Sequence, residues 1–242
     1  MSDAPNALPS GDNVKSSAYV EKYFEALYRD NDDPWQYQTR WYEQRKRDMC
    51  LAILPQDTYA NAIELGCGNG VFSQLLAHRC QALLSIDGNH SAVQLARQRL
   101  IEAPHAEVLK GVIPDVLLAL QNEGPPAPSI SQLADAPSHR PPYDLIVISE
   151  VLYYLSARTL TTVIEWIQQN IAAGGTLLCC HWRYDIEGFA LTGETVHQRL
   201  QQAFSQEYKA SFTHQSQLVD SDFLLDIWQN SQKTVAMQEH LV

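Results

Sequence analysis

Residues 62–70 (AIELGCGNG) combine a short apolar run with three glycines and one carboxylate. Gly66, Gly68 and Gly70 follow the run at intervals of two, and a segment with helical periodicity, 71–78, comes directly after them. Glycine at such a turn permits positive φ angles and a close approach of a ligand, while the helix start offers unpaired N–H groups. The pattern therefore predicts a strand, a ligand-binding turn and a helix; a glycine turn without a ligand is the alternative.

Glu64 indicates which kind of ligand this turn would accept. Dinucleotide-binding units use the spacing G-x-G-x-x-G and bind a pyrophosphate at the helix start, whereas the third glycine here comes one residue earlier. A carboxylate two residues before the first glycine would repel a pyrophosphate and attract an ammonium or sulfonium group. The residues therefore favour a cationic ligand.

A second apolar run, 82–86, ends in Asp87, 21 residues after Gly66. A carboxylate at about that spacing, at the tip of the second strand, accepts hydrogen bonds from the hydroxyls of a ribose in nucleotide-binding sheets. Residues 87–89 (DGN) are also typical of a simple turn, so a structural role for Asp87 stays open.

The motif 64–70 (ELGCGNG), together with Asp87, resembles the cofactor site of class I S-adenosylmethionine-dependent methyltransferases. Segments 28–45 (YRDNDDPWQYQTRWYEQR), 149–155 (SEVLYYL) and 181–197 (HWRYDIEGFALTGETVH) resemble the narrower nodulation N-methyltransferase (NodS-like) family. The resemblance covers residues 19–204 and implies S-adenosyl-L-methionine as cofactor, with S-adenosyl-L-homocysteine as product. Members of that family methylate the free amine of a deacetylated chitooligosaccharide, so an amino sugar acceptor is implied by the resemblance.

The resemblance also implies a set of cofactor contacts. The expected cofactor-binding residues are Trp35, Arg40, Glu64, Gly66, Cys67, Gly68, Gly70, Asp87, Gly88, Val112, Ile113 and Ser149. Arg40 is expected to pair with the methionyl carboxylate, and Trp35 or Tyr28 to line the donor pocket; aromatic padding of the sheet is the alternative. Val112 and Ile113 stand where the family commonly has a polar residue facing adenine, so packing and backbone contacts are expected there.

Methyl transfer to an amine requires alignment of donor and acceptor and a group that takes the proton of the amine. The candidates are Glu150 and His181, which end the fourth and fifth expected strands, and His197, in the first turns of a later helix. Each residue also has a purely structural interpretation. Glu150 would be an acid that stabilises a helix N-terminus, His181 a hydrogen-bonded histidine at a strand end, and His197 a surface histidine. The expected substrate-binding residues are Tyr153, Tyr154 and Arg183.

Composition excludes several classes of protein. The formal charge of −11 opposes a nucleic-acid substrate, and the basic clusters 45–47 and 97–99 are expected on solvated helix faces. The five cysteines include no C-x-x-C pair, which favours reduced thiols, no metal site and a cytoplasmic location. No apolar run reaches ~18 residues and no signal peptide is evident, so a membrane partner is not expected. No obligate protein partner is evident.

The order of the periodic segments predicts an α/β protein with a doubly wound, Rossmann-like, seven-stranded sheet, mostly parallel with an antiparallel C-terminal edge pair. The expected strands are 62–65, 82–87, 106–110, 142–149, 176–182, 207–213 and 222–228. The expected helices are 17–29, 39–54, 71–78, 89–102, 114–122, 157–172 and one capped near Thr192. A single domain, 17–230, would contain cap helices (17–55) and a flexible Pro/Ala/Ser-rich insert (123–142), between a disordered N-terminus (1–16) and a tail (231–242).

Two other functions remain compatible with the residues. A nucleotide-cofactor oxidoreductase would use the same topology, although Glu64 and the early third glycine argue against it. A binding module that holds the cofactor without turnover would carry the same cofactor residues. The sequence therefore predicts a small-molecule methyltransferase and leaves the identity of its acceptor open.

Overall fold

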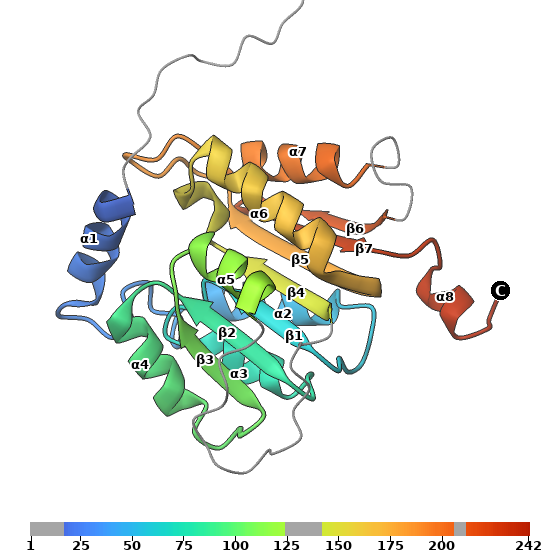
Figure 1. Ribbon diagram of the computed structural model, residues 1–242, viewed down its shortest axis with the longest axis horizontal. Coiled ribbons are helices and arrows are strands. Elements are labelled where there is room, and N and C mark those ends of the chain that lie inside the picture. The colour runs from blue at the N-terminus through green and yellow to red at the C-terminus, as the bar shows by residue number, and fades with distance from the viewer. Residues whose placement is uncertain (1–16, 124–141, 206–211) are drawn as a thin grey trace, which may run out of the picture.

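The computed structural model describes residues 17–123, 142–205 and 212–242 (Figure 1). The helices are α1 (Ser17–Tyr28), α2 (Trp41–Ala52), α3 (Val71–Ala77), α4 (His90–Arg99), α5 (Asp115–Glu123), the 3-10 helix η1 (Leu152–Tyr154), α6 (Ala157–Asn170), α7 (Gly193–Ala203) and α8 (Val235–Gln238). The strands are β1 (Ala62–Leu65), β2 (Leu83–Asp87), β3 (Ala106–Lys110), β4 (Tyr143–Ser149), β5 (Ile171–Trp182), β6 (Thr213–Val219) and β7 (Phe223–Gln229). The expected N-terminal disorder and all but the two end residues of the expected insert lie outside the described residues.

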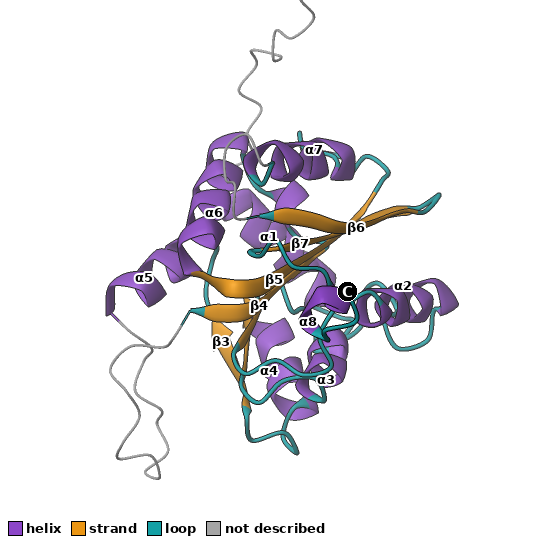
Figure 2. Ribbon diagram, turned by 90° about the vertical axis from the view of Figure 1, so that its right-hand side faces the viewer, coloured by secondary structure: helices purple, strands orange, loops and turns teal. Residues whose placement is uncertain are grey.

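The strands form one sheet in the order β3-β2-β1-β4-β5-β7-β6. Strands β1 to β5 run parallel, whereas β7 pairs antiparallel with β5 and β6 antiparallel with β7. Helices cover both faces, with α5, α6 and α7 on one side and α2, α3 and α4 on the other (Figure 2). The predicted seven-stranded, mostly parallel sheet with an antiparallel C-terminal pair is therefore confirmed.

The central strands read as continuous apolar runs because they are covered on both faces. All four residues of β1 are buried, and so are Leu145 to Ile148 of β4. Ile63 and Leu65 contribute to the core beneath α6 and α7, whereas Ala62 joins the core beneath α2 and α3. This burial fixes the register of the strands and thereby places their carboxyl ends at one edge of the sheet.

Three predicted boundaries in the C-terminal half are wrong, those of β6, α6 and β5. Strand β6 spans Thr213–Val219 and shares only Thr213 with the predicted strand 207–213. Its sequence, THQSQLV, carries polar side chains because an edge strand has one solvent-facing side. Helix α6 ends at Asn170 and not at 172, and β5 begins at Ile171 and not at 176, because Ile171 already pairs with Tyr143.

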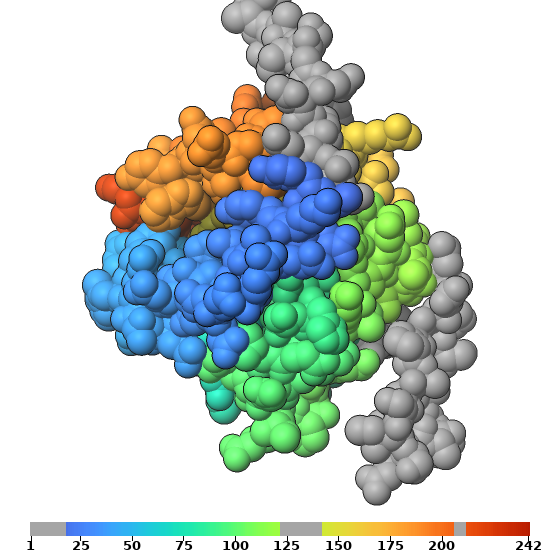
Figure 3. Space-filling model, turned by 90° about the vertical axis from the view of Figure 1, so that its left-hand side faces the viewer, coloured from blue at the N-terminus to red at the C-terminus, as the bar shows by residue number. Residues whose placement is uncertain are grey.

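The cap formed by α1 and residues 29–40 lies over the carboxyl edge of the sheet. Viewed toward this face, the N-terminal segment in blue covers the middle of the molecule, between the orange loop before α7 and the green segments around β3 (Figure 3). Asn69 links this cap to the glycine turn, because its Nδ2 donates to the Asp32 carbonyl at 3.0 Å and to Asp33 Oδ1 at 3.2 Å. The cap is thus positioned by the turn that it covers.

Candidate functional site

A cleft of about 1320 Å³ opens between the cap and the carboxyl ends of the parallel strands. Of the residues that sequence reasoning selected, the cleft is lined by Trp35, Arg40, Gly66, Gly68, Asp87, Gly88, Val112, Ile113, Ser149, Glu150, Tyr153 and Tyr154. The residues that do not line it are Glu64, Cys67, Gly70, His181, Arg183 and His197. The site is therefore assembled at the sheet edge where open α/β folds bind ligands.

The glycine turn has the backbone that its spacing predicts. Gly66, Gly68 and Gly70 have φ angles of +78°, +53° and +78°, a region that favours glycine. A Cβ on Gly66 would lie 2.8 Å from Val151 Cβ, and one on Gly70 would lie 2.8 Å from Ala96 Cα. The turn thus has no room for a Cβ at Gly66 or Gly70, and Gly66 and Gly68 line the cleft.

Replacing Gly66 with alanine is expected to lower the free energy of unfolding by about 2–4 kcal/mol, since a left-handed backbone and an overpacked contact both cost energy. Gly174→Ala provides a matched control, because Gly174 has a φ of +79° but no atom within 4 Å of its added Cβ. Urea unfolding of both variants checks this. Equal losses would show that the contact with Val151 contributes nothing.

Asp87, at the end of β2, holds the glycine turn and faces the cleft. Its Oδ2 accepts a hydrogen bond from the Gly68 N–H at 2.9 Å, and its Oδ1 accepts one from the Asn89 N–H at 2.8 Å. Burial raises the pKa of Asp87 above its ordinary value, although the backbone donors oppose this. Each oxygen retains acceptor capacity, so the carboxylate suits a ligand with two neighbouring hydroxyls.

Glu64 lies beneath the glycine turn and not in the cleft. Its Oε2 accepts hydrogen bonds from the hydroxyls of Ser73 at 2.5 Å and Ser85 at 2.8 Å, and the residue is 3% exposed. It lines a separate chamber of about 40 Å³ behind the turn, together with Cys67, whose pKa burial also raises. Burial raises the pKa of Glu64 to about 7, while the two serine hydroxyls partly oppose the shift.

The raised pKa of Glu64 predicts that stability falls with pH. A carboxyl whose pKa is about 7 when folded and 4.5 otherwise binds its proton more tightly in the native state. Its contribution is therefore complete below pH ~4.5 and is lost as pH rises through ~7, an effect of roughly 3 kcal/mol at most. Urea unfolding between pH 5 and 8 is expected to show a shallower decline for Glu64→Gln than for the wild type. The exposed-site control, Glu165→Gln, should retain the wild-type slope.

Glu150 belongs to an acidic cluster that we define as Glu43, Lys46 and Glu150, with Lys46 at its centre. The Lys46 ammonium is 2.6 Å from Glu150 Oε1 and 3.0 Å from Glu43 Oε2. Glu150 Oε2 also accepts hydrogen bonds from the Tyr153 hydroxyl at 2.5 Å and the Trp182 N–H at 2.9 Å. Glu150 has a φ of +60°, a strained conformation that these contacts maintain.

The acidic cluster corrects the expectation that residues 45–47 form a solvated face. Lys46 is 4% exposed and Arg47 is 8% exposed, and Arg47 Nε and Nη1 have no hydrogen-bond partner among the described residues. Burial alone would lower the pKa of Lys46, but the charges of Glu150 and Glu43 raise it. Sequence reasoning missed Glu43 and Lys46 because an ion pair three residues apart on a helix has the same spacing whether it is buried or exposed.

Three of the expected catalytic and substrate-binding side chains are engaged away from the cleft. His181 and His197 are buried and hydrogen-bonded to each other, at 3.0 Å between Nδ1 and Nε2. Arg183 Nε donates to Glu194 at 2.8 Å, and its Nη1 donates to the Asp220 carbonyl at 2.7 Å. None of the three is therefore presented to a ligand in the cleft.

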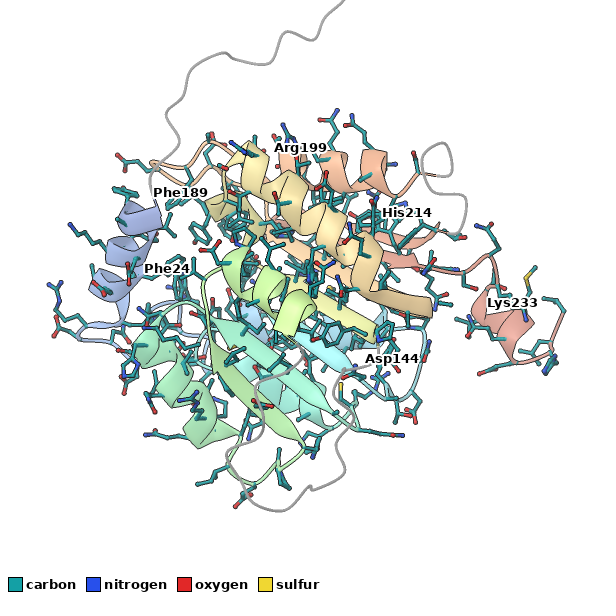
Figure 4. The ribbon with its side chains drawn as sticks, viewed as in Figure 1. Phe24, Asp144, Phe189, Arg199, His214 and Lys233 are labelled. Carbon is teal, nitrogen blue, oxygen red and sulfur yellow. The ribbon has the colours of Figure 1, made fainter. Side chains whose placement is uncertain are left out.

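Aromatic side chains form the cleft wall beside the acidic cluster. The Tyr154 ring lies edge-on to Phe24 of α1, with centroids 4.9 Å apart, and to Phe189, with centroids 4.7 Å apart. Phe24 and Phe189 lie on the same side of the molecule, at α1 and in the loop before α7 (Figure 4). Trp35 stacks on Tyr37 with centroids 5.5 Å apart. The wall offers ring faces to a ligand while the cluster offers charge.

No helix in the described ranges combines the length and the apolar composition that a membrane span requires. Within the same ranges, no group of three His, Cys, Asp or Glu side chains is arranged to hold a metal ion.

The chain is similar to known nodulation proteins and methyltransferases. Nodulation protein S from Sinorhizobium fredii is 30% identical over 149 residues, which make up 61% of this chain and 59% of that protein. Nodulation protein S from Rhizobium tropici is 31% identical over the same share of this chain and 54% of its own length. The chain thus matches less than two thirds of the length of these curated relatives.

Solved structures give matches over more of the chain. The crystal structure of N-methyltransferase NodS from Bradyrhizobium japonicum WM9 in complex with S-adenosyl-L-homocysteine has a TM-score of 0.67 and 25% identity, covering 87% of this chain and 98% of that one. A Pseudomonas syringae protein provisionally assigned as a methyltransferase is 35% identical with a TM-score of 0.60, over 78% of this chain and 99% of that one. The family model described as a methyltransferase domain matches residues 37–235. The resemblance to S-adenosylmethionine-dependent methyltransferases is thereby confirmed, and the chain belongs to the methyltransferase domain family.

Proposed function

We propose that this protein transfers a methyl group from S-adenosyl-L-methionine to the amine of a small-molecule acceptor, and that the acceptor is an amino sugar. The observation that carries this proposal is the acidic cluster at the cleft, where two carboxylates surround one ammonium. The similarity to an N-methyltransferase supports it, because that relative is described as acting on nitrogen.

The glycine turn and its surroundings fit the proposed cofactor. A Cβ on Gly68 would lie 3.2 Å from the Tyr28 hydroxyl, so Tyr28 of the cap packs this closely against the turn only because the residue is glycine. Tyr28 and Gly68 both line the cleft, so the cap and the turn would enclose a bound cofactor between them. Asp87 would accept the hydroxyls of the ribose, and Arg40 would pair with the methionyl carboxylate. When bound, the cofactor supplies a methyl group activated by a positively charged sulfur.

The acidic cluster accounts for the choice of an amine. Within the cluster two carboxylates face one ammonium, an excess of negative charge that favours an acceptor arriving as a cation and that the nearby Arg47 guanidinium partly offsets. The same charge lets the cluster take up one proton when the amine becomes neutral for attack. Burial raises the pKa of Glu43, despite Lys46, which favours this proton uptake.

The aromatic wall accounts for the choice of a sugar ring. Aromatic faces suit both cations and sugar rings, and Trp35 and Tyr154 line the cleft together with Glu150. An acceptor could therefore rest its ring on the wall while its amine reaches the cluster. The alternatives of an oxidoreductase and of a non-catalytic module receive no support from the relatives.

A labelled-methyl assay tests the proposal. Label from S-adenosyl-L-methionine is expected to enter a deacetylated chitooligosaccharide and not the fully acetylated counterpart, which differs only at the amines. Transfer to hydroxyl acceptors with none to amines would overturn the choice of nitrogen. Tight binding of S-adenosyl-L-homocysteine without transfer to any acceptor in a single turnover would instead indicate the binding module.

A further inference from the structure

Behind the cleft wall, four side chains from three strands and one helix form a continuous hydrogen-bonded chain. His181 Nδ1 of β5 lies 3.0 Å from His197 Nε2 of α7. His197 Nδ1 contacts Asp226 Oδ2 of β7, and Asp226 Oδ1 lies 2.5 Å from Nε2 of His214. His214 lies at the edge strand β6 (Figure 4), whereas the other three residues are buried. The inner end of the chain is His181 Nε2, which accepts a hydrogen bond from the Leu152 N–H at 3.3 Å.

The hydrogen-bond partners determine which nitrogen of each buried histidine carries its hydrogen. An ionised carboxylate only accepts, so His197 Nδ1 must donate to Asp226 and His197 Nε2 is left as an acceptor. His181 Nδ1 must then donate to His197, which leaves His181 Nε2 as the acceptor for the Leu152 N–H. Every donor faces an acceptor, so both histidines are neutral and have one tautomer each.

The electrostatic surroundings agree with this assignment. Burial lowers the pKa of His181, and the positive charge of Lys46 lowers it further. Burial alone would raise the pKa of Asp226, but the hydrogen bonds from His197 and His214 hold it below its ordinary value. A neutral His181 and an ionised Asp226 are the states that the chain of hydrogen bonds requires.

The inner end of the chain supports the acidic cluster. Leu152 begins η1, whose next residue, Tyr153, donates its hydroxyl to Glu150. Trp182, which follows His181, donates its N–H to the same carboxylate oxygen. The His181 ring also lies edge-on to the Tyr153 ring, with centroids 5.4 Å apart. The two residues that donate to Glu150 Oε2 are Tyr153 and Trp182. They directly follow Leu152 and His181, which are hydrogen-bonded to each other.

We propose that Asp226, His197 and His181 are positioning residues: Asp226 sets the tautomer of His197 and through it that of His181, which then holds η1 and orients Tyr153 and Glu150 toward the cleft. This inference uses the proposed function for its activity readout. It assigns no proton transfer to the histidines, because His181 Nε2 faces a backbone amide and neither histidine lines the cleft.

Two substitutions at position 181 separate the roles. In His181→Gln, the amide oxygen occupies the place of Nε2 and can still accept from the Leu152 N–H. In His181→Asn, the shorter side chain reaches only the place of Nδ1, and the Leu152 N–H therefore loses its acceptor. We expect His181→Gln to retain most of the wild-type kcat and His181→Asn to lose about tenfold, with the affinity for S-adenosyl-L-homocysteine unchanged in both. Equal losses of kcat would overturn the proposal, and equal losses together with a vanished limb of the pH–rate profile would identify His181 as a base.

Nitrogen-15 NMR of the wild-type histidines gives a readout that needs neither turnover nor a variant. The Nδ1–H tautomer is expected for both His181 and His197, and at His181 it should persist from pH 6 to 8. An Nε2–H tautomer or an imidazolium signal at His181 in that range would overturn the proposal. If no acceptor is methylated at all, the proposed function fails, while the tautomers still decide whether the chain of hydrogen bonds is set by Asp226.

Discussion

Replacing Glu150 with glutamine is expected to lower kcat by about a hundredfold while changing the Kd for S-adenosyl-L-methionine less than about threefold. The glutamine amide can still accept from Tyr153 and Trp182, but its NH₂ group then faces the Lys46 ammonium, which is a donor. The acidic cluster would also lose its net negative charge, so an ammonium acceptor is no longer attracted. Steady-state kinetics and calorimetry on the same preparation measure both effects.

Two matched variants sharpen this experiment. Tyr153→Phe removes one hydrogen bond to Glu150 but keeps the charge, so a loss of about fivefold, equivalent to ~1 kcal/mol, is expected. Glu165→Gln removes an exposed carboxylate on α6 and should behave as the wild type. A Glu150→Gln variant with a normal kcat and weak cofactor binding would reassign Glu150 to the cofactor.

Most of the sheet follows from local sequence because its central strands are buried on both faces. β1 is buried throughout and apolar except for Glu64, β4 carries the apolar run Leu145 to Ile148, and the glycine turn after β1 has the positive φ angles that its spacing requires. Asn89 and Thr192 cap their helices, Thr192 as predicted, since each side chain accepts a hydrogen bond from a backbone N–H three residues on. Local patterns were sufficient here because each interaction involves neighbours in the chain.

Strand β6 shows where local patterns fail. An edge strand with one solvent-facing side need not be apolar, and THQSQLV has few residues that favour strands over turns. Its position is set by pairing with β7, from Thr213 opposite Gln229 to Val219 opposite Leu224. This register depends on pairing with another strand, so the local pattern of apolar residues does not predict it.

The acidic cluster and the buried histidines were beyond sequence reasoning for a related reason. Lys46 meets a carboxylate 104 positions away, and His197 meets one 29 positions away. Charge alone suggested a solvated face for residue 46, because an isolated buried ammonium is costly. The cost is offset by two carboxylates that only the folded chain brings together.

Replacing Asp87 with alanine is expected to weaken the binding of S-adenosyl-L-homocysteine by about 10- to 100-fold, since hydrogen bonds to a charged acceptor contribute roughly 1.5–3 kcal/mol. The carboxylate ends β2 beside Gly88 and faces the cleft, where it would accept the hydroxyls of the ribose. Isothermal titration calorimetry measures the affinity, with Asp185→Ala, an exposed acid outside the cleft lining, as the control.

Asp87 also accepts backbone hydrogen bonds from Gly68 and Asn89, so a weaker affinity alone does not separate ribose binding from a loosened turn. A cofactor analogue whose ribose lacks the 2′-hydroxyl makes the distinction. The wild type should bind the analogue less tightly than S-adenosyl-L-homocysteine, and Asp87→Ala should bind both equally, because the acceptor of that hydroxyl is gone. If the variant discriminates between the two ligands as strongly as the wild type, Asp87 holds the turn and does not bind the ribose.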